Sequence, residues 1–219
     1  MNFLFIGAHP DDAEFFAGGT MALLVRAGHK VLALSLTNGD IGHHEMGGGM
    51  LAQRRVAESQ AAATIGGYES LTLDTHDGEL MPSLELRKSV ARIIRLHNAD
   101  MVFTHRPNDY HPDHRYTAQV VQDAAYMVMV PQFCPDTKAL RKNPVFFYFY
   151  DPFQYPAPFR ADVVVSMEKV MDLKWQLLHV MTSQFYEWLP WLEGILGEVP
   201  PDEEEGARLH WLKSHYSPL

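Results

Sequence analysis

The sequence predicts an α/β fold: a Rossmann-like, mostly parallel sheet with helices on both faces, in a single domain. Three observations support this prediction. Short apolar runs that suit buried strands alternate with longer segments of helical character. The 219 residues are enough for one substantial core. Hydrophobic residues make up 47% of the chain and charged residues 21%, which is the ordinary composition of a globular domain.

The N-terminal third supplies two strand–helix pairs. Residues 3–8 form a continuous apolar run, which is typical of a strand buried on both faces of a parallel sheet. The helix that follows, over residues 14–27, ends at Gly28, a residue type that commonly terminates helices. Residues 31–36 predict the second strand, and residues 51–65 predict a helix that a pair of glycines stops.

The same alternation continues along the chain. We expect a third strand over residues 70–73. A helix should begin after Ser83, a favourable N-cap residue, and reach about residue 97. A fourth strand over residues 101–104 leads through a polar loop to a helix over 113–129. Two later strands and a helix are expected over residues 145–150, 163–165 and 168–181.

Composition narrows the classes of function. The net charge of -9 argues against a nucleic-acid partner, since nucleic-acid binders usually present a basic face. No apolar stretch reaches the roughly 18 residues of a membrane-spanning helix, so no membrane association is expected. Cys134 is the single cysteine, which favours a cytoplasmic location and leaves nitrogen and oxygen to hold any metal. Within the domain 1–219, residues 183–219 form an aromatic-rich extension of unassigned structure that favours a homo-oligomer.

Two clusters combine imidazole with carboxylate: His-Pro-Asp-Asp at residues 9–12 and His-Pro-Asp-His at residues 111–114. Each lies close after a predicted strand, and the carboxyl ends of parallel strands meet at one edge of the sheet. Two histidines and one carboxylate form a catalytic zinc site with an open position for water. The surplus carboxylates and imidazole suit proton transfer and oxyanion stabilisation in amide hydrolysis. Alternatively, each cluster is an ordinary loop in which Asp12 or Asp113 caps a helix.

Together with Gly18-Gly19-Thr20, these clusters closely resemble the PIG-L/LmbE-like N-acetylglucosaminyl deacetylase family, whose members include the deacetylases of mycothiol and bacillithiol biosynthesis. Weaker similarities extend the resemblance over most of residues 3–185: Thr37-Asn38-Gly39-Asp40, Arg55-x-x-Glu58, Asp77-Gly78, Thr104-His105 and Ser183-Gln184. Many members carry Glu directly after the paired aspartates, whereas here Ala13 intervenes before Glu14. The resemblance implies a zinc-dependent hydrolase that removes acetyl from an N-acetylglucosamine-type sugar or conjugate, giving acetate and a free amine.

The resemblance also implies a role for individual residues. The positions that match the zinc ligands are His9, Asp12 and His114. Asp11 matches the general base that later acts as acid, and His111 matches the imidazole that stabilises the oxyanion. Asp113 matches the residue that orients or charges this imidazole. A site of two histidines and one carboxylate also accepts Fe²⁺.

Arg55 and Asp77 match positions implicated in holding the sugar. For Arg55 the alternative is a surface charge on a helix, and for Asp77 it is a turn made with Gly78. Two other functions stay open at the level of the whole chain. One is an amidase that acts on an N-acyl group outside the sugars, and the other is a non-catalytic metal-binding module.

Overall fold

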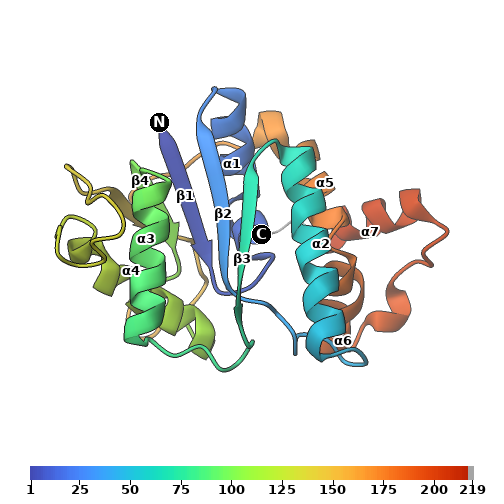
Figure 1. Cartoon of the computed structure of the whole chain (residues 1–219). Helices are drawn as coiled ribbons and strands as arrows, with labels where there is room; N and C mark the ends of the chain where they lie inside the picture. The colour runs from blue at the N-terminus through green and yellow to red at the C-terminus, as the bar shows by residue number, and fades with distance from the viewer. Residues whose placement is uncertain (217–219) are drawn as a thin grey trace.

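The structure is a computed structural model of the chain and describes residues 1–216. Its centre is a five-stranded sheet with the strand order β3-β2-β1-β4-β5 (Figure 1). The strands are β1 (Asn2–Gly7), β2 (Lys30–Thr37), β3 (Glu69–Thr75), β4 (Met101–Thr104) and β5 (Val145–Tyr148). All four pairings are parallel. The strand order reverses its direction between β1 and β4, which is where parallel α/β sheets bind ligands.

Helices cover both faces of the sheet (Figure 1). On one face lie α3 (Leu84–Leu96) and α4 (Pro112–Met127). On the other face lie α1 (Asp12–Arg26), α2 (Gly48–Gly66) and α5 (Met171–His179). The predicted Rossmann-like α/β class is therefore confirmed.

Local chemistry sets several of the helix ends. The Ser83 hydroxyl accepts a hydrogen bond from the backbone N–H of Leu86 at 3.1 Å, as expected of the N-cap of α3. Gly67 follows α2 with a φ of 71°, a left-handed conformation that glycine adopts without strain. Pro112 opens α4, where its missing N–H costs no hydrogen bond.

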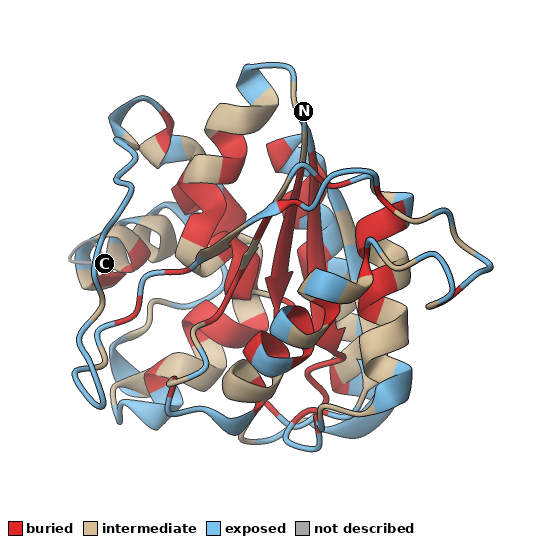
Figure 2. Cartoon of the chain, turned by 90° about the vertical axis from the view of Figure 1, so that its left-hand side faces the viewer, coloured by how far each residue is buried: buried red, intermediate tan, exposed pale blue. Residues whose placement is uncertain are grey.

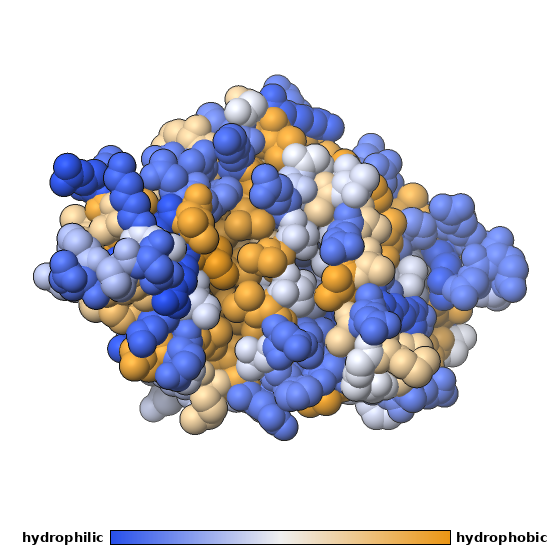
Figure 3. All heavy atoms as spheres, in the orientation of Figure 1, coloured by the Kyte–Doolittle hydropathy of each residue, from blue (hydrophilic) through white to orange (hydrophobic). Residues whose placement is uncertain are grey.

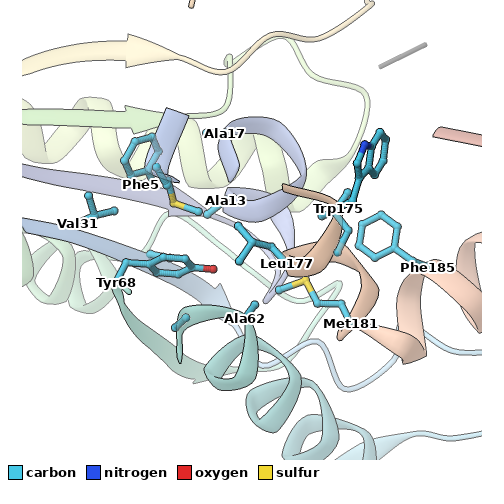
Figure 4. Packing of buried hydrophobic residues seen from close by; sticks show 14 of the residues in the cluster. Phe5, Ala13, Ala17, Val31, Ala62, Tyr68, Trp175, Leu177, Met181 and Phe185 are labelled. Carbon is cyan, nitrogen blue, oxygen red and sulfur yellow. The ribbon is translucent and has the colours of Figure 1, made fainter. Parts of the chain in front are cut away.

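The sheet separates two hydrophobic cores, and β1 contributes to both. Phe3 and Phe5 join the core beneath α1, α2 and α5, whereas Leu4 and Ile6 join the core beneath α3 and α4. Successive side chains of a strand point to opposite faces, so a strand buried on both sides must be apolar throughout. Figure 2 shows the central strands as buried, and Figure 4 shows Phe5 of β1 and Leu177 of α5 among the side chains of one core.

One predicted strand is wrong. Residues 163–165 have no strand partner, and the exposed fractions of these three valines are 63%, 84% and 41%. The segment follows a loop that contains Pro152, Pro156 and Pro158, residues without a backbone N–H to donate to a sheet. High β-propensity alone therefore did not recruit the valines to the sheet.

The C-terminal extension is helical where it is described, and residues 217–219 lie outside the described part. It comprises a π-helical turn (Ser183–Trp188), α6 (Leu189–Leu192), a 3₁₀ turn (Leu196–Glu198) and α7 (Glu205–Tyr216). The helix α7 packs against α5 and adds Leu212 and Tyr216 to the core on that face.

Two features bear on the expected associations with membranes and with other copies of the chain: the apolar character of the helices and the exposed edge of the sheet. In residues 1–216 no helix has both the length and the apolar character needed to cross a bilayer. β3 is an edge strand, and Figure 3 shows hydrophobic residues in the middle of the face seen there, with Leu71 of β3 40% exposed. An exposed apolar edge suits association with another chain, but the expected homo-oligomer stays a prediction.

Candidate active site

The two clusters meet beyond the carboxyl ends of β1 and β4. His9 and Asp12 come from the loop after β1 and the first turn of α1, and His114 comes from the first turn of α4. His9 Nδ1 lies 3.2 Å from His114 Nε2 and 3.5 Å from Asp12 Oδ2. His114 Nε2 lies 3.5 Å from Asp12 Oδ1. The structure thus brings together the three residues expected to bind a metal.

This donor set fits a divalent cation in geometry and in charge. Ligand atoms about 2.0–2.1 Å from a tetrahedral zinc ion lie about 3.3 Å from one another. The two imidazole nitrogens are 3.2 Å apart, and each lies 3.5 Å from one of the two Asp12 carboxylate oxygens. Among the described residues that line the adjoining cavity, three carboxylates (Asp11, Asp12 and Asp77) face a single guanidinium, that of Arg55. A dication would neutralise this excess of negative charge.

The far nitrogens of both histidines face carboxylates. His9 Nε2 lies 3.0 Å from Asp77 Oδ1, and His114 Nδ1 lies 2.9 Å from Asp109 Oδ2. A carboxylate accepts hydrogen bonds, so each of these nitrogens carries the proton and leaves the other nitrogen free to bind a metal. Asp77 and Gly78 do form a turn, in which the Glu79 N–H donates to the His76 carbonyl at 3.2 Å, and from this turn the Asp77 side chain faces His9.

Asp109 is a site residue that sequence reasoning missed. Besides facing His114, its carboxylate accepts the backbone N–H of His111 at 2.8 Å, and its side chain is buried. Burial raises the pKa of Asp109, but the hydrogen bond and charge of His114, together with the backbone N–H of His111, outweigh burial and hold this pKa below its usual value. The sequence feature that could have indicated a role for Asp109 is its position in the polar loop between β4 and α4.

We expect Asp109→Asn to weaken metal binding about 10–100-fold, because a neutral amide orients and polarises the His114 imidazole less well than a carboxylate. Titration of the metal against a competing chelator measures this affinity. The matched control is Asp136→Asn, which alters an exposed carboxylate paired with Arg92 at 2.7 Å on the protein surface. Equal metal affinities for the two variants would mean that Asp109 does not support the metal site.

Asp12 is fixed by the loop it belongs to. Its Oδ2 accepts the backbone N–H groups of residues 8 and 9, both at 2.8 Å, and faces His105 Nε2 at 3.0 Å. Burial raises the pKa of Asp12, but the neighbouring imidazoles outweigh burial and hold this pKa well below its usual value. A Cβ on Gly7 would lie 2.5 Å from the Asp12 Cβ, so only glycine permits this approach. The N-cap of α1 is Asp11, and Asp12 is the first residue of the helix, so the simple helix-cap alternative is wrong for Asp12.

Arg55 holds Asp11. Its Nη2 donates to Asp11 Oδ1 at 2.8 Å and its Nη1 to the carbonyl of Gly39 at 3.3 Å. Only 3% of Arg55 is exposed, so the surface-charge alternative is wrong. Burial raises the pKa of Asp11 above its ordinary value, and Arg55 opposes that rise. Asp11 is therefore a half-buried carboxylate with one oxygen anchored and with access to the cavity.

Asp113 orients His111 through its backbone and not through its carboxylate. The Asp113 N–H donates to His111 Nδ1 at 3.2 Å, which places the imidazole proton on Nε2. The Asp113 carboxylate instead accepts the N–H of Gly78 at 2.7 Å and lies 3.7 Å from His9 Nε2. Burial lowers the pKa of His111, and His9 lowers it further, which favours a neutral imidazole. The N-cap of α4 is His111, so the cap alternative for Asp113 is also wrong.

The C-terminal extension forms part of the cavity, and Glu58 of α2 anchors it. The Glu58 carboxylate accepts the Ser183 N–H at 2.9 Å, the Ser183 hydroxyl at 2.6 Å and the Thr182 hydroxyl at 3.0 Å. Gln184 Nε2 in turn donates to the Gly42 carbonyl at 3.1 Å. These contacts explain the Arg55-x-x-Glu58 and Ser183-Gln184 similarities as fixation of the cavity wall.

Glu58→Ala should therefore lower the free energy of unfolding by about 2–4 kcal/mol, since it leaves several buried donors without an acceptor. Chemical denaturation provides the measurement. Glu69→Ala removes an exposed carboxylate from β3 and serves as the control. If both variants unfold at the same denaturant concentration, Glu58 does not anchor the extension.

The chain is similar to known proteins over most of its length. Residues 4–125 match the family model described as GlcNAc-PI de-N-acetylase, PIG-L. Diacetylchitobiose deacetylase of Thermococcus kodakarensis is 30% identical over 209 residues, which cover 88% of this chain and 75% of that protein. 4-Oxalmesaconate hydratase of Pseudomonas putida is 25% identical over 194 residues, 84% of this chain and 74% of that protein.

Solved structures agree with the sequence comparison. N,N'-diacetylchitobiose deacetylase from Pyrococcus horikoshii, in complex with its inhibitor, superposes with a TM-score of 0.77. The identity is 26%, and the match covers 90% of this chain and 76% of that one. The predicted resemblance is confirmed: this chain belongs to the PIG-L, or GlcNAc-PI de-N-acetylase, family.

Proposed function

We propose that this protein is a metal-dependent N-deacetylase that removes the acetyl group from an N-acetylglucosamine-type sugar or conjugate, releasing acetate and a free amine. One observation carries the proposal: the donors of His9, Asp12 and His114 converge beside a cavity that Asp11 also lines. The fold does not choose the reaction, because a hydratase is among the relatives. The deacetylase activity named for the relative at 30% identity supports the amide reaction.

Each residue of the cluster has a task in this reaction. His9, Asp12 and His114 would hold Zn²⁺ or Fe²⁺, and such a cation supplies Lewis acidity that polarises a carbonyl and acidifies water. Asp11 takes the proton of the attacking water and later delivers it to the nitrogen of the leaving amine. Arg55 favours the ionised carboxylate at the start, and burial, which raises the pKa of Asp11, favours the protonated form needed later.

His111 stabilises the negative charge that develops on the acetyl oxygen. Its Nε2–H is the donor, because Nδ1 already accepts the backbone N–H of Asp113. A donor that is oriented before the reaction stabilises the transition state without reorganisation. The sugar-holding roles of Arg55 and Asp77 belong to the proposal as well, and both residues line the cavity. Because they contact Asp11 and His9, their substitution would also disturb catalysis.

The deciding experiment measures acetate release by the zinc-loaded protein from N-acetylglucosamine and its glycosides, and from simple N-acetyl amides. Release from the sugars alone supports the proposal. Preference for simple amides would make the protein an amidase of another class. A metal-loaded protein that releases no acetate from any of them would be a metal-binding module. A cytoplasmic location, which the single buried Cys134 favours, is tested by fractionating the cells that produce the protein.

A further inference from the structure

Much of the cavity is lined by side chains that the hydrolysis of an acetyl amide does not use. The cavity has a volume of about 530 Å³. Six apolar side chains from three separate segments form what we call the apolar wall: Phe15, Phe16, Ile41, Trp188, Leu189 and Leu192. An acetyl group offers one methyl to such a surface, so the wall has room for a larger apolar group.

The outer end of this wall lies at the mouth of the cavity. Ile41 and Leu192 line the cavity and are nevertheless 59% and 56% exposed. Large apolar side chains held in water beside a polar site favour any ligand that covers them. Because the acetyl group must lie beside the metal cluster, a ligand group that reaches the mouth is attached to the sugar and not to the acetyl group.

The wall is ordered before a ligand arrives. The His44 ring stacks on His43 at a centroid distance of 4.6 Å and on Trp191 at 5.4 Å. Trp191 stacks in turn on Trp188 at 5.4 Å. Glu187 fixes this stack, because its carboxylate lies 2.7 Å from His43 Nε2. A preformed apolar surface loses little conformational entropy on binding.

The described lining of the cavity offers no free arginine or lysine to an anionic group. Among the described residues that line the cavity, Arg55 is the single arginine or lysine, and its Nη atoms already bind Asp11 and Gly39. Arg54, one position earlier, donates to Glu187 at 2.7 Å. At the mouth of the cavity a phosphate or carboxylate on the substrate would therefore meet no free arginine or lysine with which to pair.

We propose that the amino-sugar substrate carries an uncharged, apolar aglycone that packs against Ile41, Leu189 and Leu192. This inference rests on the N-deacetylation proposed above. It assigns the C-terminal extension a role in substrate choice, since Leu189 and Leu192 belong to α6.

The test compares kcat/KM for acetate release from phenyl and octyl β-glycosides of N-acetylglucosamine, free N-acetylglucosamine and N-acetylglucosamine 1-phosphate. We expect the two apolar glycosides to exceed the free sugar by about 10-fold or more, with the phosphate the poorest substrate. Leu192→Asn and Ile41→Asn should each reduce the preference for the apolar glycosides about 5–10-fold. The matched control is Leu96→Asn, at a leucine that is 74% exposed at the end of α3 and outside the cavity lining; it should leave this preference unchanged.

The outcomes separate this inference from the proposed function. A free sugar or a 1-phosphate that reacts as well as the apolar glycosides overturns the apolar aglycone and leaves the deacetylation intact. Rates that rise with the length of the N-acyl chain instead of the aglycone also overturn it. A change in oligomeric state in Leu192→Asn with an unchanged substrate preference would make the wall an interface between copies. Absence of acetate release from every sugar refutes the deacetylation, and the inference with it.

Discussion

Asp11→Asn is expected to lower kcat for acetate release about 10²–10⁴-fold while the metal content of the purified protein stays unchanged. Asparagine keeps the shape of the side chain but cannot accept the proton of an attacking water. The close donor contacts of the metal cluster join His9, Asp12 and His114, so the cation should bind without Asp11. Steady-state kinetics and elemental analysis of the same preparation measure the two quantities.

The control for this variant is Asp172→Asn, at an exposed aspartate that pairs with Lys213 on the surface. Its kcat and metal content should match those of the unaltered protein. Near-normal turnover by Asp11→Asn would mean that another group serves as the base. Loss of the metal would instead place Asp11 among the ligands. Either result would require a different assignment of the paired aspartates.

Much of the fold could be predicted because local patterns and burial agree. Residues 3–8 are apolar throughout because β1 is buried on both faces, and Ser83 is a helix cap whose partner lies three residues away. The valines at 163–165 have the same β-propensity but no neighbouring strand. Whether a strand forms depends on a partner that comes from elsewhere in the chain, and composition alone does not reveal it.

The meeting of the two clusters could be predicted for the same reason: strand ends in a parallel sheet share an edge. The surroundings of the clusters could not. Arg55 lies on a helix without a strongly apolar stripe, so its burial against Asp11, 44 positions away, leaves no local signal. The contact between Glu58 and Ser183 spans 125 positions and depends on where the C-terminal extension packs.

Glu14 shows how one position changes the environment of a side chain. On a helix, adjacent residues point about 100° apart, so moving the glutamate from position 13 to position 14 turns it to another face of α1. Glu14 is buried, and its carboxylate accepts the Tyr68 hydroxyl at 2.7 Å instead of lining the catalytic cavity. Burial raises the pKa of Glu14 to about 7. The resemblance alone could not assign this residue a place outside the cavity.

His114→Ala is expected to abolish stoichiometric metal binding, and with it the stabilisation that the metal provides. For the unaltered protein, a free metal concentration of 100 times Kd should raise the free energy of unfolding by about 2.7 kcal/mol. His114→Ala should show little of this gain, whereas His210→Ala, at an exposed imidazole on α7, should show all of it. Thermal denaturation with and without added zinc, together with metal analysis, measures the difference.

The same experiment distinguishes His9 from His105, because Asp12, His105 and His114 also form a group that could hold a metal. His105 Nε2 lies 3.0 Å from Asp12 Oδ2, so this nitrogen donates its proton to the carboxylate and is not free to bind a cation. The His9 Nδ1 carries no proton and is free to bind a cation, because the proton of that ring lies on Nε2, which faces Asp77. We therefore expect His9→Ala to lose the zinc-dependent stabilisation as His114→Ala does, and His105→Gln to retain most of it. The reverse result would move the metal deeper, to the far side of Asp12.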